Sequence, residues 1–242
     1  MAPDTRTHRG SHSDDIVLFS EATIPTLRSA TRDVSWLLTR GYAPDSSLKL
    51  VGDRYQLKAR QRTAVSRSSC SDQTLQRRLD RQVSSEQLSG KSIAIDGYNL
   101  LTTVEGALGG AILLGGRDGA IRDLISMHGT YRKVAETEPA LEFVAKAVKQ
   151  LGVKEVHWYL DRPVSNSGRL KQLIQECSKR EGREWQVELV SNPDRELANC
   201  DEIVVTSDSE ILNRCTHWFP LAGYIVTDLI PRAWILLLGD KD

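Results

Sequence analysis

Cysteine, aromatic residues and long apolar runs are all scarce in this sequence. The four cysteines are widely scattered and form no Cys-x-x-Cys pair, which argues against a zinc site and against a disulfide framework. The apolar run Ala233–Leu238 is far too short to span a bilayer. The polar amino terminus lacks the apolar segment of a secretory signal. We therefore expect a cytoplasmic protein that does not associate with membranes.

Two frequent catalytic patterns are also missing. The glycine-rich segment Gly106–Gly119 does not end in the Gly-Lys-Ser/Thr of a phosphate-binding loop. No serine lies in a nucleophile-elbow motif, so Ser-His-Asp catalysis is unsupported. Chemistry based on either pattern is not expected.

Charge is balanced over the 242 residues, with a formal net charge of zero, but it is unevenly distributed. Residues 1–91 carry 15 Lys and Arg against 10 Asp and Glu, and the remainder carries 17 against 22. Between Lys49 and Arg81 the ratio is nine to three. A basic amino-terminal half and an acidic carboxyl-terminal half suit a nucleic-acid-binding region joined to a cation-dependent site. The alternative is a chance imbalance between two solvated surfaces.

The amino-terminal third reads as helical. Residues 1–20 mix Pro, Thr, Gly, Ser and Asp and predict a disordered tail. Residues 21–83 predict a small basic helical domain, and residues 84–91 a linker. The apolar spacing and the Arg-rich polar segments indicate four helices, at Ile24–Leu38, Ser46–Tyr55, Leu57–Arg67 and Asp72–Val83.

From residue 92 onward, strands alternate with helices. Strands are predicted at Ile93–Asp96, Val153–Asp161, Val187–Val190, Glu202–Thr206 and Gly223–Val226, with an edge strand at Trp234–Leu238. Helices are predicted at Asp118–Met127, Pro139–Leu151, Arg169–Lys179 and Ile211–Cys215. This alternation predicts an α/β domain over residues 92–242, with a mostly parallel sheet between two layers of helices.

Three predicted strands end at or just before an aspartate, namely Asp96, Asp161 and Asp208. Parallel strands point the same way, so their carboxylates should meet at one edge of the sheet. Clustered carboxylates repel one another unless a cation is present, and hard oxygen ligands suit Mg²⁺ or Mn²⁺. Such ions activate water for phosphodiester hydrolysis. For Asp96 alone, capping of the following helix is an equally good explanation.

Two segments carry a family resemblance. Ile-Ala-Ile-Asp96-Gly-Tyr-Asn99 and Val-Val-Thr206-Ser207-Asp208-Ser-Glu resemble the PIN-like nuclease superfamily, in particular its NYN branch. Arg40-Gly-Tyr42, Leu50–Tyr55 and Gln61-Arg62 are similar to a helical domain of unknown function that precedes a PIN-like domain in uncharacterised prokaryotic proteins. The resemblance spans residues 21–230 and implies a three-layer α/β/α PIN-like fold.

The resemblance also implies roles for individual residues. Asp96, Asp161 and Asp208 would be catalytic and would bind the metal, and Asp194 or Asp201 would stand in for the aspartate that usually precedes the fourth-strand motif and act as a further ligand. The helix-borne acidic residue of the superfamily has two candidates here, Asp118 and Asp123. Asn99, Thr206 and Ser207 would lie beside the acids and help to bind the substrate.

Other candidate substrate contacts come from the residues themselves. The loop after Asp161 carries Ser165, Asn166 and Arg169, which can contact phosphate near a helix start or can simply form a turn and a cap. The basic segment adds Arg54, Arg60 and Arg62.

These observations predict a metal-dependent endoribonuclease with Mg²⁺ or Mn²⁺ as cofactor and RNA, or another single-stranded nucleic acid, as partner. A homo-oligomer is compatible with the sequence. One alternative is a PIN-like RNA-binding module with a degenerate acidic site. The other is a phosphoesterase that acts on small molecules.

Overall fold

Four short strands form a wholly parallel sheet in the computed structural model, which describes residues 8–125 and 131–239. The sheet order is β5-β4-β1-β6, with β1 at Ser92–Asp96, β4 at Glu155–Asp161, β5 at Gln186–Val190 and β6 at Ile203–Val205. Neighbouring strands are parallel throughout, with Asp96 opposite Tyr159 and Ile95 opposite Val205. The carboxyl ends of all four strands therefore meet at one edge, which confirms the predicted α/β class with a parallel sheet.

Helices cover both faces of this sheet. Ile93 and Ile95 lie in the larger apolar core, together with residues of α6 (Gly97–Leu108), α7 (Thr137–Gln150) and α8 (Ser167–Arg180). Ala94 faces the opposite way, into a smaller core shared with α9 (Pro193–Asn199) and α10 (Ser209–Arg214). Burial on both faces explains why β1 and β6 read as continuous apolar runs, whereas β4 alternates buried with partly exposed residues and β5 carries exposed ones.

A second sheet lies beside the first and was not expected as such. It has the order β3-β2-β7, with β2 at Leu113–Gly115, β3 at Ile121–Asp123 and β7 at Ile235–Leu237. The helix predicted over Asp118–Met127 is therefore wrong in its described part, and residues 126–127 lie outside the described ranges. The edge strand predicted at Trp234–Leu238 forms, but it joins this second sheet by pairing with β2.

The strand predicted at Gly223–Val226 is also wrong. That segment forms α11 (Leu221–Tyr224), which runs into the π-helical turn η2 (Ile225–Leu229). Its apolar residues are buried in the larger core, and a short buried apolar run does not distinguish a strand from a helix.

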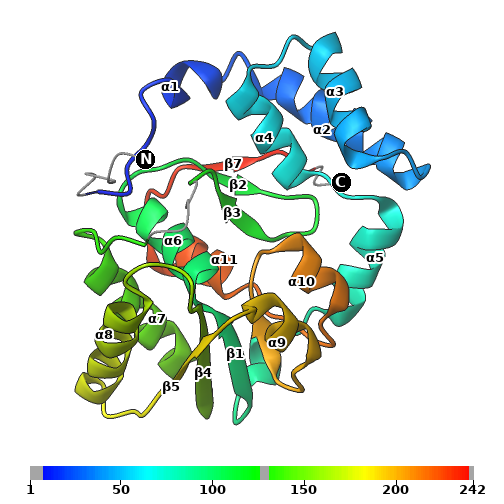
Figure 1. Cartoon of the computed structure of the whole chain (residues 1–242). Helices are drawn as coiled ribbons and strands as arrows, with labels where there is room; N and C mark the ends of the chain where they lie inside the picture. Colours follow the sequence, from blue (N-terminus) through cyan, green and yellow to red (C-terminus); the bar gives the residue numbers. More distant parts are fainter. Residues whose placement is uncertain (1–7, 126–130, 240–242) are drawn as a thin grey trace.

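Four amino-terminal helices form where the sequence predicts them, namely α2 (Ile24–Thr39), α3 (Pro44–Arg54), α4 (Ala59–Ser68) and α5 (Asp72–Arg81). Leu27, Ala30 and Val34 of α2 share an apolar core with Leu114 of β2 and with Ile112, which directly precedes β2. Figure 1 shows the second sheet between α2–α4 and the parallel sheet. In the two described ranges, no helix is both long and apolar enough to cross a bilayer.

Residues 8–20 differ from the predicted disordered tail. They include the short helix α1 (Asp15–Leu18), and the side chains of Arg9, Asp15 and Phe19 are buried. Arg9 pairs with Glu105 of α6 at 2.9 Å, and Asp15 pairs with Arg60 of α4. The predicted linker 84–91 is likewise anchored, through the 3₁₀ turn η1 (Ser85–Leu88) and the buried Leu88. These long-range charged and apolar contacts fix segments whose local composition suggests mobility.

Candidate functional site

The candidate site lies at the carboxyl ends of β1 and β6. Asp96 is the last residue of β1, and α6 begins at once with Gly97. A Cβ atom at Gly97 would lie 2.5 Å from Leu160 Cδ2 and 3.1 Å from the Tyr159 carbonyl oxygen. Glycine at this position therefore allows α6 to begin directly against β4. Asp96 then lies at the carboxyl end of β1.

Asp96 is bound from the neighbouring strand. Thr206 Oγ1 donates to Asp96 Oδ2 at 2.8 Å, and the same hydroxyl accepts from the Asp208 backbone N–H at 3.0 Å. Asp96 occupies the N-cap position of α6, yet within the described part of the chain its side chain makes no capping hydrogen bond. Asp208 does cap its helix, because its Oδ1 accepts from Glu210 N at 2.8 Å and from Ile211 N at 3.2 Å. Asp208 is thus a helix cap. Asp96 makes no such capping hydrogen bond, although the Asn99 backbone N–H of α6 also favours its charged form.

The loop after β6 is held in place from two sides. Asn99 Oδ1 accepts from the backbone N–H of Ser207 at 2.8 Å and from its hydroxyl at 2.9 Å. Arg122 Nε donates to the Ser207 carbonyl oxygen at 2.8 Å. The structure therefore brings Asn99, Thr206 and Ser207 together with Asp96 and Asp208, as predicted from the sequence.

The carboxylates of this edge act on one another electrostatically. Burial raises the pKa of Asp96 to about 7, with smaller contributions in the same direction from the charges of Asp208 and Asp194. The hydrogen bond from Thr206 and the backbone N–H of Asn99 oppose this rise. Burial also raises the pKa of Asp194, and the charges of Asp208 and Asp161 contribute in the same direction. The charges of Asp208 and Asp194 thus act on Asp96, whereas Asp161 is related to this group only through its effect on Asp194.

Asp118 lies elsewhere, in a buried ion-pair network. Its carboxylate accepts from Arg122 at 2.8 and 2.7 Å and from Arg78 Nη1 at 2.5 Å. Burial alone would raise the pKa of Asp118, but Arg122 and Arg78 outweigh it and hold that pKa well below the usual range. The prediction of Asp118 as a metal ligand is therefore not supported. Asp123, the other candidate, accepts from the hydroxyls of Thr102 and Thr103.

A polar pocket of about 340 Å³ is lined by Asp208 but not by Asp96, Asp161 or Asp194. Its lining carries both signs of charge and includes Arg67, Asn99, Arg122, Ser207 and Asp208. Arg67 was not among the predicted site residues, although it belongs to the basic segment 49–81. Its only sequence signal is that regional charge.

The predicted substrate-binding arginines serve mainly to hold the amino-terminal helices together. Arg60 binds the buried Asp15 and the Leu124 carbonyl oxygen, and Arg62 binds Asp53 at 2.7 Å and the Leu57 carbonyl oxygen at 3.0 Å. Arg54 is exposed on α3, with its guanidinium 5.6 Å from the ring centre of Tyr55.

The loop after β4 shows turn chemistry. Asn166 has a φ of 70° and donates from Nδ2 to the Tyr131 carbonyl oxygen at 3.0 Å. Ser165 accepts from the Tyr131 backbone N–H through its own carbonyl oxygen at 3.3 Å, and Arg169 is exposed on α8. The turn explanation accounts for Ser165 and Asn166, although the Asn166 side chain makes no capping hydrogen bond to α8.

The acidic residues offer the ligands of a partly hydrated cation. Among residues 8–125 and 131–239, no three His, Cys, Asp or Glu side chains are arranged to hold a metal ion by themselves. Asp96, Asp208 and Asp194 nevertheless supply carboxylate oxygens in one negative region. Mg²⁺ is commonly bound through one or two carboxylates, with waters and substrate phosphates completing the shell. Such an arrangement would need only Asp96 and Asp208 from this edge of the sheet, and the described residues form no all-protein cage.

The chain is thus an α/β protein with an acidic site at the carboxyl edge of a parallel sheet and a helical amino-terminal region. Residues 85–224 match a domain of unknown function (DUF5616), and the chain belongs to that family. Residues 26–81 match a second family, a protein of unknown function (DUF434), which confirms the expected helical segment of unknown function.

One relative covers most of the chain. The sequence is 32% identical over 187 residues to the uncharacterized protein MJ0935 of Methanocaldococcus jannaschii, a match that spans 77% of this chain and 89% of that protein. No solved structure matches the chain significantly.

Proposed function

We propose that this protein is a PIN-like, metal-dependent endoribonuclease whose site is centred on Asp96. The observation that carries the proposal is the link from Asp96 through the Thr206 hydroxyl to the Asp208 backbone. The two motifs that resemble the superfamily, Ile93–Asn99 and Val204–Glu210, lie on the paired strands β1 and β6 and continue into this link. The nuclease function is thus supported by a resemblance and by a geometry that agree.

The residues of the site have separable tasks in this proposal. Asp96 and Asp208 would hold the cation, with Asp194 beside them, and Thr206 orients the Asp96 carboxylate. Asn99 fixes the Ser207 loop, so that the two acidic strand ends keep their spacing. A bound divalent cation would neutralise charge on the scissile phosphate and acidify a water molecule.

Cationic groups next to the acids favour a phosphate-bearing substrate. Arg67 donates to the Asp123 carbonyl oxygen, lies 3.6 Å from the Asp123 carboxylate and keeps about a third of its side chain exposed beside the pocket. Arginine binds phosphodiester oxygens well, and such contacts position a nucleic acid without reading its sequence. We infer that Arg67 binds the RNA backbone close to the reacting phosphate.

A catalytically silent RNA-binding module is the second candidate. It is favoured by one observation, that no three side chains of the described residues form a ready-made metal site. In such a module the same fold and the same cationic groups would hold RNA without hydrolysis.

The test is cleavage of a mixed single-stranded RNA pool by purified protein with Mg²⁺, with Mn²⁺ and with EDTA. A matched DNA pool and p-nitrophenyl phosphate serve as the other substrates. The proposal predicts internal RNA cleavage that requires a divalent cation. Binding that weakens steeply with salt, without cleavage under any condition, would favour the silent module. Hydrolysis of p-nitrophenyl phosphate alone would favour the small-molecule phosphoesterase.

A further inference from the structure

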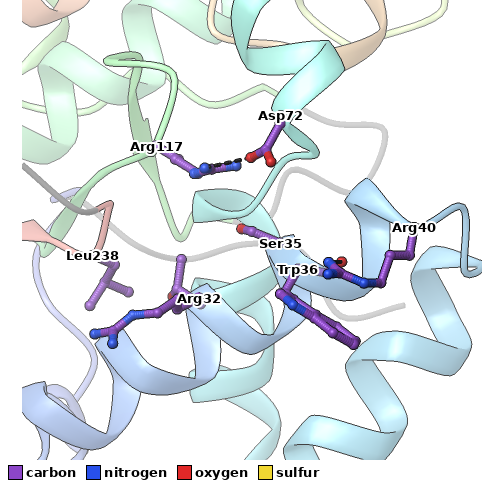
Figure 2. Close-up of a pocket in the computed structure, with 8 residues that line it drawn as sticks. Arg32, Ser35, Trp36, Arg40, Asp72, Arg117 and Leu238 are labelled. Atoms are coloured by element: carbon purple, nitrogen blue, oxygen red, sulfur yellow. Dashed lines mark hydrogen bonds and ion pairs between the residues drawn. The ribbon is translucent and has the colours of Figure 1, made fainter.

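A second polar pocket lies away from the acidic residues, between α2, the start of α5 and the turn that joins β2 to β3. Figure 2 shows its side chains. The pocket has a volume of about 140 Å³. Three arginines and one aspartate contribute charge to it, and the principal lining residues are Arg32, Ser35, Trp36, Arg40, Asp72 and Arg117. The lining therefore has an excess of positive charge.

The aromatic side chain of this pocket is unusually accessible. Trp36 is 52% exposed, whereas tryptophan is normally largely buried. The Arg40 guanidinium lies 3.5 Å from the centre of the Trp36 ring, which is a stacking distance. A flat cation stacked on an exposed indole forms a surface on which another flat, electron-rich group can stack.

Two further features suit an anion. Arg117 is held by Asp72 at 2.6 Å and by the Cys70 carbonyl oxygen at 3.0 Å, so its guanidinium is fixed at the pocket. Ser35 is 97% buried, and its hydroxyl has no hydrogen-bond partner among the described residues. A buried hydroxyl without a partner is costly, and a ligand oxygen would relieve that cost.

The end of α4 connects this pocket with the pocket at the candidate active site. Arg67, near the end of that helix, lines the pocket beside the acids. The next residue, Ser68, accepts from the Arg117 backbone N–H at 3.0 Å, and Ser69 Oγ donates to the carbonyl oxygen of Thr31, which lines the second pocket. The two pockets thus flank one short stretch of chain.

We propose that the Trp36–Arg40–Arg117 pocket is a second anchor for single-stranded RNA, which binds a phosphate group and stacks the attached base several nucleotides away from the scissile bond. This proposal rests on the proposed function, because it assumes that RNA occupies the acidic site. It assigns the amino-terminal helices a direct part in holding the polymer, and it makes the recognition independent of base identity.

The experiment measures the affinity of the full chain for a short single-stranded RNA in EDTA, where cleavage is suppressed. Trp36→Ala should weaken binding by roughly 5- to 150-fold, the range for loss of one stacked base. Arg40→Gln should weaken binding and lower the slope of log K against log salt by about 0.7, as expected for one lost phosphate contact on a single strand. Arg77→Gln removes an exposed charge of α5 outside the pocket and should change affinity much less.

Fluorescence provides a reading that is independent of affinity. Trp36 is an exposed indole, whereas Trp158, Trp185 and Trp218 are buried and Trp234 is partly buried. RNA should therefore quench wild-type fluorescence, and Trp36→Phe should lose that quenching. Unchanged thermal unfolding midpoints would show that each variant retains its fold.

The possible outcomes separate this proposal from the nuclease proposal. Wild-type affinity in Trp36→Ala and Arg40→Gln, with RNA still cleaved, would overturn the anchor and leave the nuclease intact. Loss of affinity in both variants, with no cleavage by wild type, would support the anchor and overturn the nuclease. Adenosine monophosphate or inorganic phosphate binding at the pocket as tightly as RNA would identify a site for a free small anion and overturn the polymer anchor.

Discussion

Thr206 Oγ1 lies 2.8 Å from Asp96 Oδ2 and joins two residues that are 110 positions apart in the sequence. The same hydroxyl accepts from the Asp208 backbone N–H. One oxygen atom, Thr206 Oγ1, therefore connects the end of β1 with the loop that follows β6. A carboxylate that only capped a helix would bind the amides of that helix, as Asp208 does. Asp96 instead accepts from Thr206 of the neighbouring strand, and the charges of Asp208 and Asp194 act on it.

Asp96 should make the metal-free protein less stable as pH rises. Its pKa is about 7 in the folded protein, against an ordinary value of 3.8, so the folded state favours the neutral acid. The cost of the charge is absent below about pH 4, grows as pH rises toward 7 and is complete above it. Asp96→Asn should therefore raise the unfolding free energy at about pH 8, by about 4 kcal/mol at most, and should have little effect near pH 4. Urea denaturation at both pH values measures this, and a pH-independent difference would contradict it.

Asp118 should be needed for stability. It neutralises part of a buried network in which Arg78 and Arg122 both bind its carboxylate. Asp118→Asn leaves two buried guanidinium groups without their counter-charge, which should cost about 3–5 kcal/mol. Asp45→Asn, in the exposed first turn of α3, should cost less than about 1 kcal/mol. Equal unfolding midpoints for the two variants in urea would contradict this role.

Gly97 should resist substitution because of its surroundings. A Cβ atom there would lie 2.5 Å from Leu160 Cδ2, so Gly97→Ala should destabilise the fold by about 1–3 kcal/mol. Gly168, in the first turn of α8, has nothing within 4 Å of its own Cβ position. Gly168→Ala should be neutral or slightly stabilising, by up to about 1 kcal/mol. Thermal unfolding of the two variants compares them directly, and a Gly97→Ala variant as stable as wild type would show that α6 and β4 are less closely packed than described.

The Arg9–Glu105 ion pair should anchor the amino-terminal segment. Both side chains are buried, and burial raises the pKa of Glu105 while Thr137, Tyr131 and Arg9 lower it. Arg9→Met should raise the pKa of Glu105 further and cost about 3–5 kcal/mol at neutral pH. The loss should shrink in acid, where Glu105 becomes neutral. The exposed Lys49–Asp53 pair is the control, since Lys49→Met should cost at most about 1 kcal/mol. Equal costs for the two variants in urea denaturation would contradict the anchoring role.

Local patterns and parallel topology were sufficient to predict much of the fold. The apolar spacing of Leu27, Ala30 and Val34 lies within one helix and indicates α2 without reference to any other segment. The edge position of Asp96 follows from the strand that precedes it and from the common direction of parallel strands. Both predictions depend on residues that are close together in the sequence.

The remaining features depend on contacts between distant residues. The strands β2 and β3 have only three residues each, which is too short for a period to be recognised, and β2 also pairs with β7 from the end of the chain. Asp118 resembles any other acidic residue in the sequence until Arg78, 40 positions away, is placed against it. Arg9 likewise gives no local sign of its partner Glu105, 96 positions away.

The most direct test of the Asp96 site compares single-turnover RNA cleavage by wild type, Asp96→Asn and Asp45→Asn in Mn²⁺. Asn keeps the size of the side chain and an oxygen that can accept from Thr206, but it removes the negative charge that would hold a cation. We predict that Asp96→Asn lowers the cleavage rate by at least about 100-fold, the lower end for a positioned catalytic group. Asp45→Asn, which removes an equivalent charge outside the site, should cleave at the wild-type rate. Cleavage by Asp96→Asn at the wild-type rate would contradict a catalytic site at Asp96.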